Sequence, residues 1–239
     1  MKHFIKYFLQ KILGYNNYLY RFAKYKIKRL RNDKKERDFF AFIEAIDKPG
    51  VILDVGANLG IMTWHLSKKF PDRKIVAIEP IPSNFEVLTR IVSEDKLGNV
   101  QLLNLAVGDK SGEIEMVLPE EGSVKEQGLA HVVHESIGER NIGEKYRMQC
   151  KTLDEITAGE KVAGIKMDIE NYECFALVGA REILKNSQPV LYLELWDNDN
   201  RKNCFELLEK IGYRVFVNNA GVLKLFDPKK HRQQNFVCW

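Results

Sequence analysis

The stretch from Val51 to Gly60, VILDVGANLG, constrains the fold of this chain more than any other. Its first half, Val51 to Val55, is a short β-branched apolar run, which is typical of a strand buried on both faces of a parallel sheet. Apolar residues then recur at helical spacing from Ile61, so the turn between strand and helix must be tight. Gly56 and Gly60 fit this turn because a residue without Cβ adopts positive φ and lets a ligand or helix approach the backbone.

A second apolar run ends in Glu79, 19 positions after Gly60. Rossmann-type sites place a carboxylate on ribose hydroxyls about 20 residues after the glycine turn. A dinucleotide pyrophosphate would require glycine where this chain has Asn58, and the sequence contains no P-loop. The pattern therefore predicts an adenosyl ligand without phosphates, of which S-adenosylmethionine is the common one, and Asp54 would suit its ammonium and sulfonium charges. Asn58 is also the predicted N-cap of the following helix.

Strand-like and helix-like segments alternate along the chain, and this order predicts a right-handed parallel α/β sheet. An alternating run at 113–118 predicts a hairpin partner, and 213–217 with 222–226 predicts a second hairpin. The 119–145 stretch lacks a regular pattern and is expected to be a long functional or disordered loop. The other predicted strands and helices are 74–79, 84–94, 100–107, 146–151, 162–168, 173–184, 189–196 and 203–211.

Two histidines, His131 and His134, lie in the 119–145 loop. Each is interpreted either as a surface loop residue or as a general base or substrate contact. The second interpretation rests on the imidazole group, which titrates near neutral pH.

Asp168 ends the predicted buried strand 162–168. In a doubly wound sheet the carboxyl ends of the strands surround the ligand, so Asp168 is expected to meet Asp54 and Glu79 there. The alternative for Asp168 is a helix-capping or ion-paired acid.

Basic residues are concentrated at the front of the chain. Residues 1–37 hold 12 Lys or Arg against 2 Asp or Glu, whereas the remainder is net acidic. We expect two parts, a basic amphipathic N-terminal helical extension over 1–37 and a domain over 38–239. One helical face of the extension is apolar and consists of Phe4, Ile5, Phe8, Leu9, Ile12 and Leu13.

Three roles remain open for this extension. Residues 1–31 would suit an anionic inner-leaflet surface, with aromatic and basic side chains at the head groups. The same pattern would equally cover an edge of the core or a dimer partner. Stacking of RNA bases on its aromatic residues is the third role, although the acidic body makes a nucleic-acid partner unexpected. Because no apolar run approaches 18 residues, we expect a cytoplasmic protein that is at most peripheral to a membrane.

The four cysteines are widely spaced and form no C-x-x-C pair: Cys150, Cys174, Cys204 and Cys238. This spacing predicts reduced thiols in a cytosolic protein and no zinc site. No metal site is predicted, although Asp168 with Asp197 or Asn198 would permit a divalent cation.

Several motifs, taken in order, resemble the FkbM family of S-adenosylmethionine-dependent methyltransferases. They are VILDVGANLG, IEPIPSN, NLAVGD, TLD and IKMDIENYE, and they span roughly residues 50–217. The resemblance implies an α/β class I methyltransferase (Rossmann-like) fold, doubly wound, with a mostly parallel seven-stranded sheet whose last strand is antiparallel. It also implies O-methylation of a hydroxyl on a sugar, glycan or related natural-product acceptor.

The resemblance also implies which residues form the site. Those expected to line the cofactor pocket are Asp54, Gly56, Ala57, Asn58, Gly60, Glu79, Pro80, Ala106 and Asp168. Asp168 would in addition lie near the transferred methyl group. The chain departs from the family at Glu170-Asn171, where the usual pair is Glu-Gly. Because asparagine tolerates left-handed φ, the turn is expected to survive.

Methyl transfer to a hydroxyl requires a positioned acceptor and a group that takes its proton. Asp168 is the first candidate for that base, and His131 or His134 is the second. Two other functions stay open. One is a catalytically inactive cofactor-binding or assembly protein at the membrane surface, and the other is an RNA methyltransferase, which would require a basic catalytic face.

Overall fold

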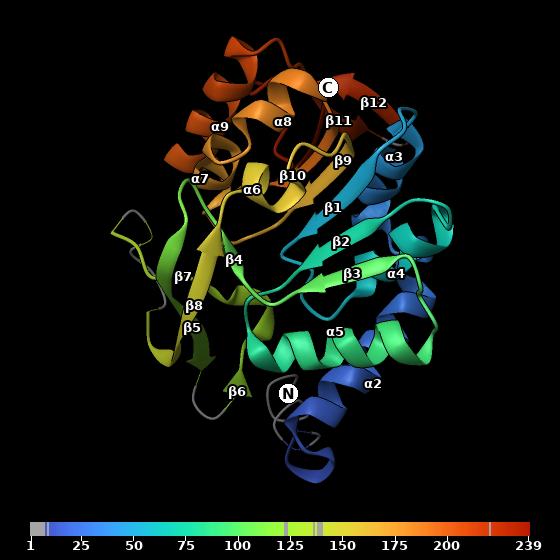
Figure 1. The fold of residues 1–239 in the computed structure, drawn as a ribbon, viewed down its shortest axis with the longest axis vertical. Coiled ribbons are helices and arrows are strands. Elements are labelled where there is room, and N and C mark those ends of the chain that lie inside the picture. Colours follow the sequence, from blue (N-terminus) through green and yellow to red (C-terminus); the bar gives the residue numbers. More distant parts are fainter. Residues whose placement is uncertain (1–7, 9, 122–123, 136, 138–140, 220) are drawn as a thin grey trace.

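The computed structural model describes residues 8, 10–121, 124–135, 137, 141–219 and 221–239. Within these residues the main sheet has eight strands in the order β12-β11-β13-β10-β9-β1-β2-β3, with helices on both faces (Figure 1). Five neighbouring strands run parallel and form its centre: β10 (Val190–Glu194), β9 (Val162–Met167), β1 (Val51–Val55), β2 (Ile75–Ile78) and β3 (Val100–Leu103).

Three C-terminal strands complete the main sheet. β13 (Asn235–Cys238) lies antiparallel between β10 and β11 (Val215–Asn219), and β12 (Val222–Leu225) forms the predicted hairpin with β11. The predicted doubly wound, mostly parallel sheet with an antiparallel last strand is confirmed. In the described chain β12 adds an eighth strand to the seven expected.

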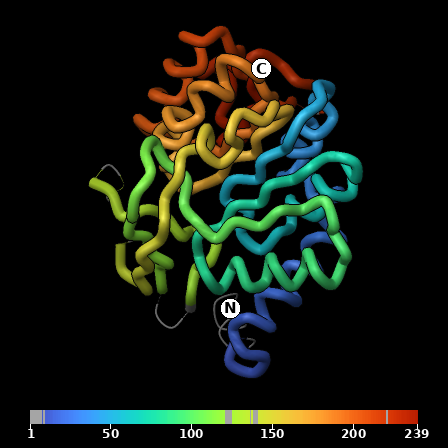
Figure 2. Tube along the Cα trace, viewed as in Figure 1, coloured from blue at the N-terminus to red at the C-terminus, as the bar shows by residue number. Residues whose placement is uncertain are grey.

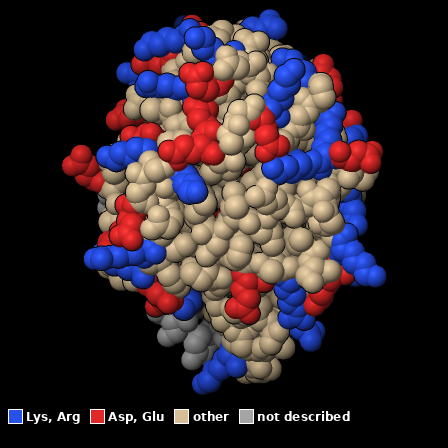
Figure 3. Space-filling model, viewed as in Figure 1, with Lys and Arg blue, Asp and Glu red and all other residues tan. Residues whose placement is uncertain are grey.

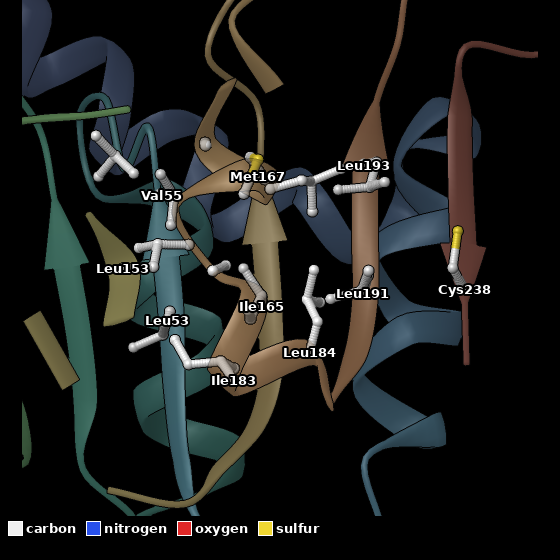
Figure 4. Packing of buried hydrophobic residues seen from close by; sticks show 14 of the residues in the cluster. Leu53, Val55, Leu153, Ile165, Met167, Ile183, Leu184, Leu191, Leu193 and Cys238 are labelled. Atoms are coloured by element: carbon white, nitrogen blue, oxygen red, sulfur yellow. The ribbon is translucent and has the colours of Figure 1, made fainter. Parts of the chain in front are cut away.

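The central strands present alternate side chains to two apolar layers. Leu53 and Leu191 point into one layer, where they pack against α6 (Leu153–Thr157), α7 (Glu173–Val178), α8 (Arg181–Asn186) and α9 (Asp199–Lys210) (Figure 4). Ile52 and Tyr192 point into the other, against α3 (Arg37–Ala45) and α4 (Ile61–Lys69). Burial on both faces explains why these strands read as continuous apolar runs.

The segment between β3 and β9 folds into a second, smaller sheet. β5 (Gly112–Glu121) and β8 (Gly143–Lys151) form a long antiparallel pair, and three short strands join them: β4 (Ala106–Val107), β6 (Val124–Lys125) and β7 (His131–Val132). The expectation of an irregular loop over 119–145 is therefore wrong for much of that stretch. The predicted single strand 100–107 is also wrong, because β3 and β4 belong to different sheets.

Long-range packing accounts for the regularity of this segment. Met116 and Leu118 of β5 share a buried apolar cluster with Val132 of β7 and with Tyr172 just before α7. Pairing of β7 with β5 is thus favoured by burial against a distant segment, although β7 itself is only two residues long.

Helix α2 (Tyr15–Arg29) packs on α4 and on α5 (Pro82–Glu94). Leu19 and Ala23 are fully buried there. In Figures 1 and 2 the blue α2 projects below α5, at the opposite end of the molecule from the C-terminus. Of the predicted apolar face, Phe4, Ile5 and Leu9 lie outside the described residues, whereas Phe8 and Ile12 are 54% and 63% exposed. Because Leu19 and Ala23 are buried, helix α2 itself covers an edge of the core.

Candidate functional site

A pocket opens at the carboxyl ends of β1, β2 and β9, where ligands bind in open α/β sheets. It encloses about 590 Å³ outside the protein atoms, part of which is open to solvent. Six of the predicted cofactor residues line it: Gly56, Asn58, Glu79, Pro80, Ala106 and Asp168. The second sheet supplies another wall with Met116, Ala130 and Val132, so the segment expected to be a loop shapes the pocket.

Glu79 follows β2 and is only 4% exposed. Its Oε2 accepts a hydrogen bond from the backbone N–H of Asn58 at 2.8 Å, and its Oε1 accepts from the backbone N–H of Ile81 at 3.0 Å. The side-chain amide of Asn84 donates a third hydrogen bond to Oε1 at 3.3 Å. Burial raises the pKa of Glu79 to about 7, although these hydrogen bonds act in the opposite direction. Because a carboxylate has about four acceptor positions, Glu79 retains capacity for a ligand hydroxyl.

The turn after β1 requires glycine at two positions. Gly56 has φ 74°, and a Cβ there would lie 2.0 Å from the carbonyl oxygen of Asp168. Gly60 has φ 79° and occupies the N-cap of α4. The prediction that Asn58 caps this helix is therefore wrong. Asn58 itself has φ 49°, its N–H donates to Glu79, and its buried Oδ1 has no hydrogen-bond partner.

Asp54, Ala57 and Gly60 are not among the residues that line the pocket. Asp54 is fully buried behind the turn, where its Oδ2 accepts a hydrogen bond from the Thr63 hydroxyl at 2.6 Å. Its Oδ1 forms an ion pair with Lys166 Nζ at 3.2 Å. Asp54 thus lies behind the turn and contacts Thr63 and Lys166, whereas the sequence predicted that it lines the cofactor pocket.

Asp168 is partly buried and lies on the pocket wall directly after β9. Burial raises its pKa, the Lys166 ammonium lowers it, and the Asp54 carboxylate raises it further, with a net increase. Because Leu193 pairs in register with Met167, Glu194 stands beside Asp168 on the neighbouring strand β10. The charge of Asp168, followed by burial, raises the pKa of Glu194 to about 8.

The loop after Asp168 keeps its turn without glycine. Glu170 and Asn171 both adopt left-handed conformations, with φ 54° and φ 74°, so the expectation that the turn survives the departure from Glu-Gly is confirmed. The Asn198 side chain donates a hydrogen bond to Asn171 Oδ1 at 2.7 Å. Buried Glu173 accepts hydrogen bonds from the Ile169 N–H at 3.0 Å and from the Asn200 amide at 2.7 Å, which fixes the loop to α9.

The structure places neither predicted histidine among the pocket-lining residues. His131 is 4% exposed, with Nδ1 2.8 Å from the Leu129 carbonyl oxygen and Nε2 3.2 Å from Asn141 Oδ1. The His134 ring packs against Phe175, with ring centroids 4.9 Å apart. Asp168 is therefore the predicted base that the fold brings to the pocket.

Four residues that matter to the site were not predicted: Thr63, Asn84, Gln127 and Lys166. Lys166 stands two positions before Asp168, and strand periodicity places both side chains on one face of the sheet, which is a signal the sequence contains. Gln127 lines the pocket from η3 (Gln127–Leu129), and nothing in the local sequence indicates this.

The pocket suits an adenosyl ligand that carries a positive charge. Glu79 could accept hydrogen bonds from ribose hydroxyls, and apolar side chains such as Ile78, Leu105 and Val107 could form a wall for an aromatic base. The buried Oδ1 of Asn58 is an acceptor that has no hydrogen-bond partner among the described residues. The carboxyl group of Asp168 favours a nearby sulfonium. Among the described residues no group of three or more His, Cys, Asp or Glu side chains is arranged to hold a metal ion.

Comparisons with known proteins agree with this geometry. The family described as Methyltransferase FkbM domain matches residues 54–221. The protein named Methyltransferase sdnD from Sordaria araneosa is 25% identical over 195 residues, which cover 71% of this chain and 75% of that protein. AMB antimetabolite synthetase AmbE from Pseudomonas aeruginosa is 22% identical over 213 residues, which cover 74% of this chain and 10% of that protein.

The fold is also found among solved structures. The crystal structure of Methyltransferase FkbM from Methylobacillus flagellatus superposes with a TM-score of 0.51 at 16% identity. The superposition covers 79% of this chain and 43% of that chain, so the present chain spans less than half of the solved protein.

Proposed function

The chain belongs to the FkbM family of S-adenosylmethionine-dependent methyltransferases, and we propose that its methyl acceptor is a hydroxyl group of a sugar, a glycan or a related natural product. The observation that carries this proposal is the set of acids that line the pocket, which are Glu79, Asp168 and Glu170. Such surroundings favour a neutral, hydroxyl-rich acceptor, because its hydroxyls donate hydrogen bonds to carboxylates.

The chain's own residues have two tasks in this reaction. When bound, S-adenosylmethionine supplies an electrophilic methyl group on a sulfonium. The pocket must hold the acceptor oxygen about 3 Å from that methyl group, and a base must take the hydroxyl proton. Asp168 is the base in this proposal. Because burial raises the pKa of Asp168, its carboxylate is more basic than that of an exposed aspartate.

RNA is disfavoured as the acceptor by the same carboxyl groups. Carboxylates on the pocket wall, such as Asp168 and Glu170, would repel the phosphates of a nucleic acid, which is bound chiefly by Lys and Arg. The other alternative is a protein that binds the cofactor but has no activity. Such a protein would bind S-adenosylhomocysteine in the pocket but would show no turnover with any acceptor, since it needs no base.

The proposal is tested by binding and turnover measured together. Calorimetric titration with S-adenosylhomocysteine is expected to show micromolar affinity that is lost in Glu79→Ala. Release of S-adenosylhomocysteine is then followed with a panel of glycan, lipid-linked sugar and polyhydroxylated acceptors. We expect Asp168→Asn to retain S-adenosylhomocysteine binding while turnover falls by about 10²–10⁴. Asp72→Asn, an exposed acid outside the pocket, serves as the matched control. Wild-type turnover by Asp168→Asn would refute the assignment of the base.

We also propose that residues 1–31 hold the protein at an anionic membrane surface, as an appendage to the 38–239 domain. No acidic residue precedes Asp33 in the sequence. The solvent-exposed side of α2 carries Arg21, Lys28 and Arg29 beside Tyr25, which is 53% exposed. At the lower end of the molecule, where α2 projects, the visible described side chains are uncharged or basic (Figure 3). Among the described helices none is long and apolar enough to cross a bilayer.

Vesicle sedimentation tests this location. We expect the protein to pellet with phosphatidylglycerol-containing vesicles and to remain free with phosphatidylcholine alone, because each basic residue near an anionic surface contributes about 1 kcal/mol. Arg21→Glu with Lys28→Glu should weaken the association at least tenfold, whereas Lys185→Glu on the exposed side of α8 should not. Equal sedimentation with neutral vesicles, or competition by single-stranded RNA with no vesicle binding, would contradict the proposal.

A further inference from the structure

Lys166 is a buried lysine behind the turn that borders the pocket. Its side chain is 4% exposed and lies in β9, in register with Asp54 of β1. Nζ donates a hydrogen bond to the carbonyl oxygen of Gly56 at 2.6 Å and lies 3.4 Å from that of Val55. An ammonium group is costly to bury without such partners, so this placement calls for a role beyond packing.

The hydrogen bond to the Gly56 carbonyl links Lys166 to the cofactor turn, which is the turn after β1 at residues 56–60. Gly56 lines the pocket, and its N–H donates to the Ile78 carbonyl at 3.0 Å. The hydrogen bond from Lys166 fixes the opposite end of the same residue. The Val55 carbonyl, which lies 3.4 Å from Lys166 Nζ, also accepts a hydrogen bond from the Asp168 N–H at 3.2 Å. Lys166 therefore lies next to both the turn at Gly56 and Asp168.

Lys166 also supplies the cation for a group of acids. Asp168 is faced by Lys166 from its own strand, by Asp54 from β1 and by Glu194 from β10. Glu36 of η2 (Lys34–Glu36) and Glu173 of α7 interact with the same group. Lys166 is the cation that acts on Asp168, whereas Glu36 is also faced by Lys26. Burial alone would lower the pKa of Lys166, but the carboxylates of Asp54 and Asp168 raise it above its ordinary value.

We infer that Lys166 is a positioning residue for methyl transfer: it fixes the carbonyl of the cofactor turn through Gly56 and keeps Asp168 ionised beside the bound cofactor. The first half of this inference rests on the family activity alone. The second half rests on the proposed role of Asp168 as the base.

Two cofactor analogues separate these effects. S-adenosylhomocysteine is uncharged at sulfur, whereas sinefungin carries an amine, cationic at neutral pH, in place of the methylsulfonium. The ratio of their affinities, measured by calorimetry across pH, reports the charge of the groups near the transferred methyl. In the wild-type protein the preference for sinefungin should appear as Asp168 ionises.

In Lys166→Met we expect the midpoint of this preference to move upward by about one pH unit or more, since an opposite charge nearby lowers a carboxyl pKa by 1–3. Affinity for S-adenosylhomocysteine should fall about tenfold, because the turn loses its hydrogen bond. Lys166→Arg, which keeps the charge, should restore the midpoint. If Lys166→Met does not fold, the Asp54→Asn/Lys166→Met double variant removes the uncompensated buried charge and still tests the affinity.

A folded Lys166→Met protein with the wild-type midpoint and affinity overturns the inference. Asp168→Asn separates that failure from a failure of the proposed function. If Asp168→Asn abolishes the midpoint while Lys166→Met leaves it unchanged, only the role of Lys166 is refuted. If the midpoint persists in Asp168→Asn, the titrating group is another acid such as Glu194, and the inference that Lys166 keeps Asp168 ionised is overturned. Turnover by Asp168→Asn then decides separately whether the proposed base fails as well.

Discussion

The side-chain amide of Asn84 joins Glu79 to the second sheet: it donates to Glu79 Oε1 at 3.3 Å and to the Gln127 carbonyl oxygen at 3.3 Å. Asn84 is 1% exposed and belongs to α5, so a helix beside the main sheet connects the pocket acid Glu79 with the wall built by η3. The Asn84 amide therefore adds a polar connection between Glu79 and that wall, beside the apolar cluster that holds the second sheet.

Asn84→Ala is expected to destabilise the protein by about 1–3 kcal/mol, because buried acceptors lose their donor. Affinity for S-adenosylhomocysteine should fall several-fold, as Glu79 and the Gln127 wall are no longer held together. Urea unfolding and calorimetry measure the two effects. Thr89→Ala, on the exposed side of the same helix, is the control, and its hydroxyl bonds only within α5. Equal binding by both variants would show that Asn84 does not shape the pocket.

Cofactor binding should depend on pH through Glu79. Ligand hydroxyls donate to the carboxylate and favour its ionised form, whereas burial has raised the pKa of Glu79 to about 7. Affinity for S-adenosylhomocysteine should therefore rise with pH up to about 7, and binding below that pH should release a proton. Calorimetry in buffers of different ionisation enthalpy measures this release. Glu79→Gln should bind more weakly, with no such release.

The same residue links stability to pH with the opposite sign. Between the ordinary pKa of 4.5 and the folded value of about 7, the folded ligand-free protein holds a proton that the unfolded chain has lost. The contribution of Glu79 to the free energy of unfolding should therefore fall across this window, by at most about 3 kcal/mol. Urea unfolding at about pH 5 and about pH 8 should show a smaller difference for Glu79→Gln than for the wild type. An identical difference would contradict the raised pKa.

Gly56→Ala should abolish cofactor binding and destabilise the fold by about 2–4 kcal/mol. The new Cβ would lie 2.0 Å from the Asp168 carbonyl oxygen at a φ of 74°, so strain and displacement of Asp168 add together. Gly159→Ala is the matched control, because it has φ 84° and nothing within 4 Å of its Cβ position. Its cost should be about 1 kcal/mol with binding intact. Similar losses in the two variants would mean that backbone strain alone matters.

Thr63→Val should show how much the Thr63 hydroxyl stabilises the carboxylate of Asp54, which is paired with Lys166 in the buried interior. The substitution keeps the shape of a fully buried side chain but removes the 2.6 Å hydrogen bond to Asp54. We expect a loss of about 1–3 kcal/mol in unfolding free energy, because a buried carboxylate loses a donor. Glu44→Gln, which breaks an exposed ion pair with Lys69, should cost less than about 1 kcal/mol. If Thr63→Val lowers the unfolding free energy no more than Glu44→Gln does, the Thr63 hydroxyl does not stabilise the buried Asp54 carboxylate.

Local sequence determined the frame of the site. The β-branched run of β1, the glycines at 56 and 60 and the acid at 79 specify a strand, a tight turn and a carboxylate, since each property resides in residues close together in the chain. The cofactor class could be predicted from them, and the parallel sheet from the alternation of strand-like and helix-like segments. The antiparallel last strand was implied only by the resemblance to the family. Likewise, the turn at Glu170-Asn171 followed from the tolerance of asparagine for left-handed φ.

Tertiary structure decided which side chains line the pocket and which lie behind it. Asp54 and Asp168 are both acids at strand ends, yet pairing with Lys166 and Thr63 holds the first behind the turn while the second lines the pocket. The sequence also did not predict the pocket wall that the second sheet supplies, because the short strands of that sheet are stabilised by burial against Tyr172, far along the chain. Side-chain orientation and strand pairing depend on partners distant in sequence, and local residue patterns do not record those partners.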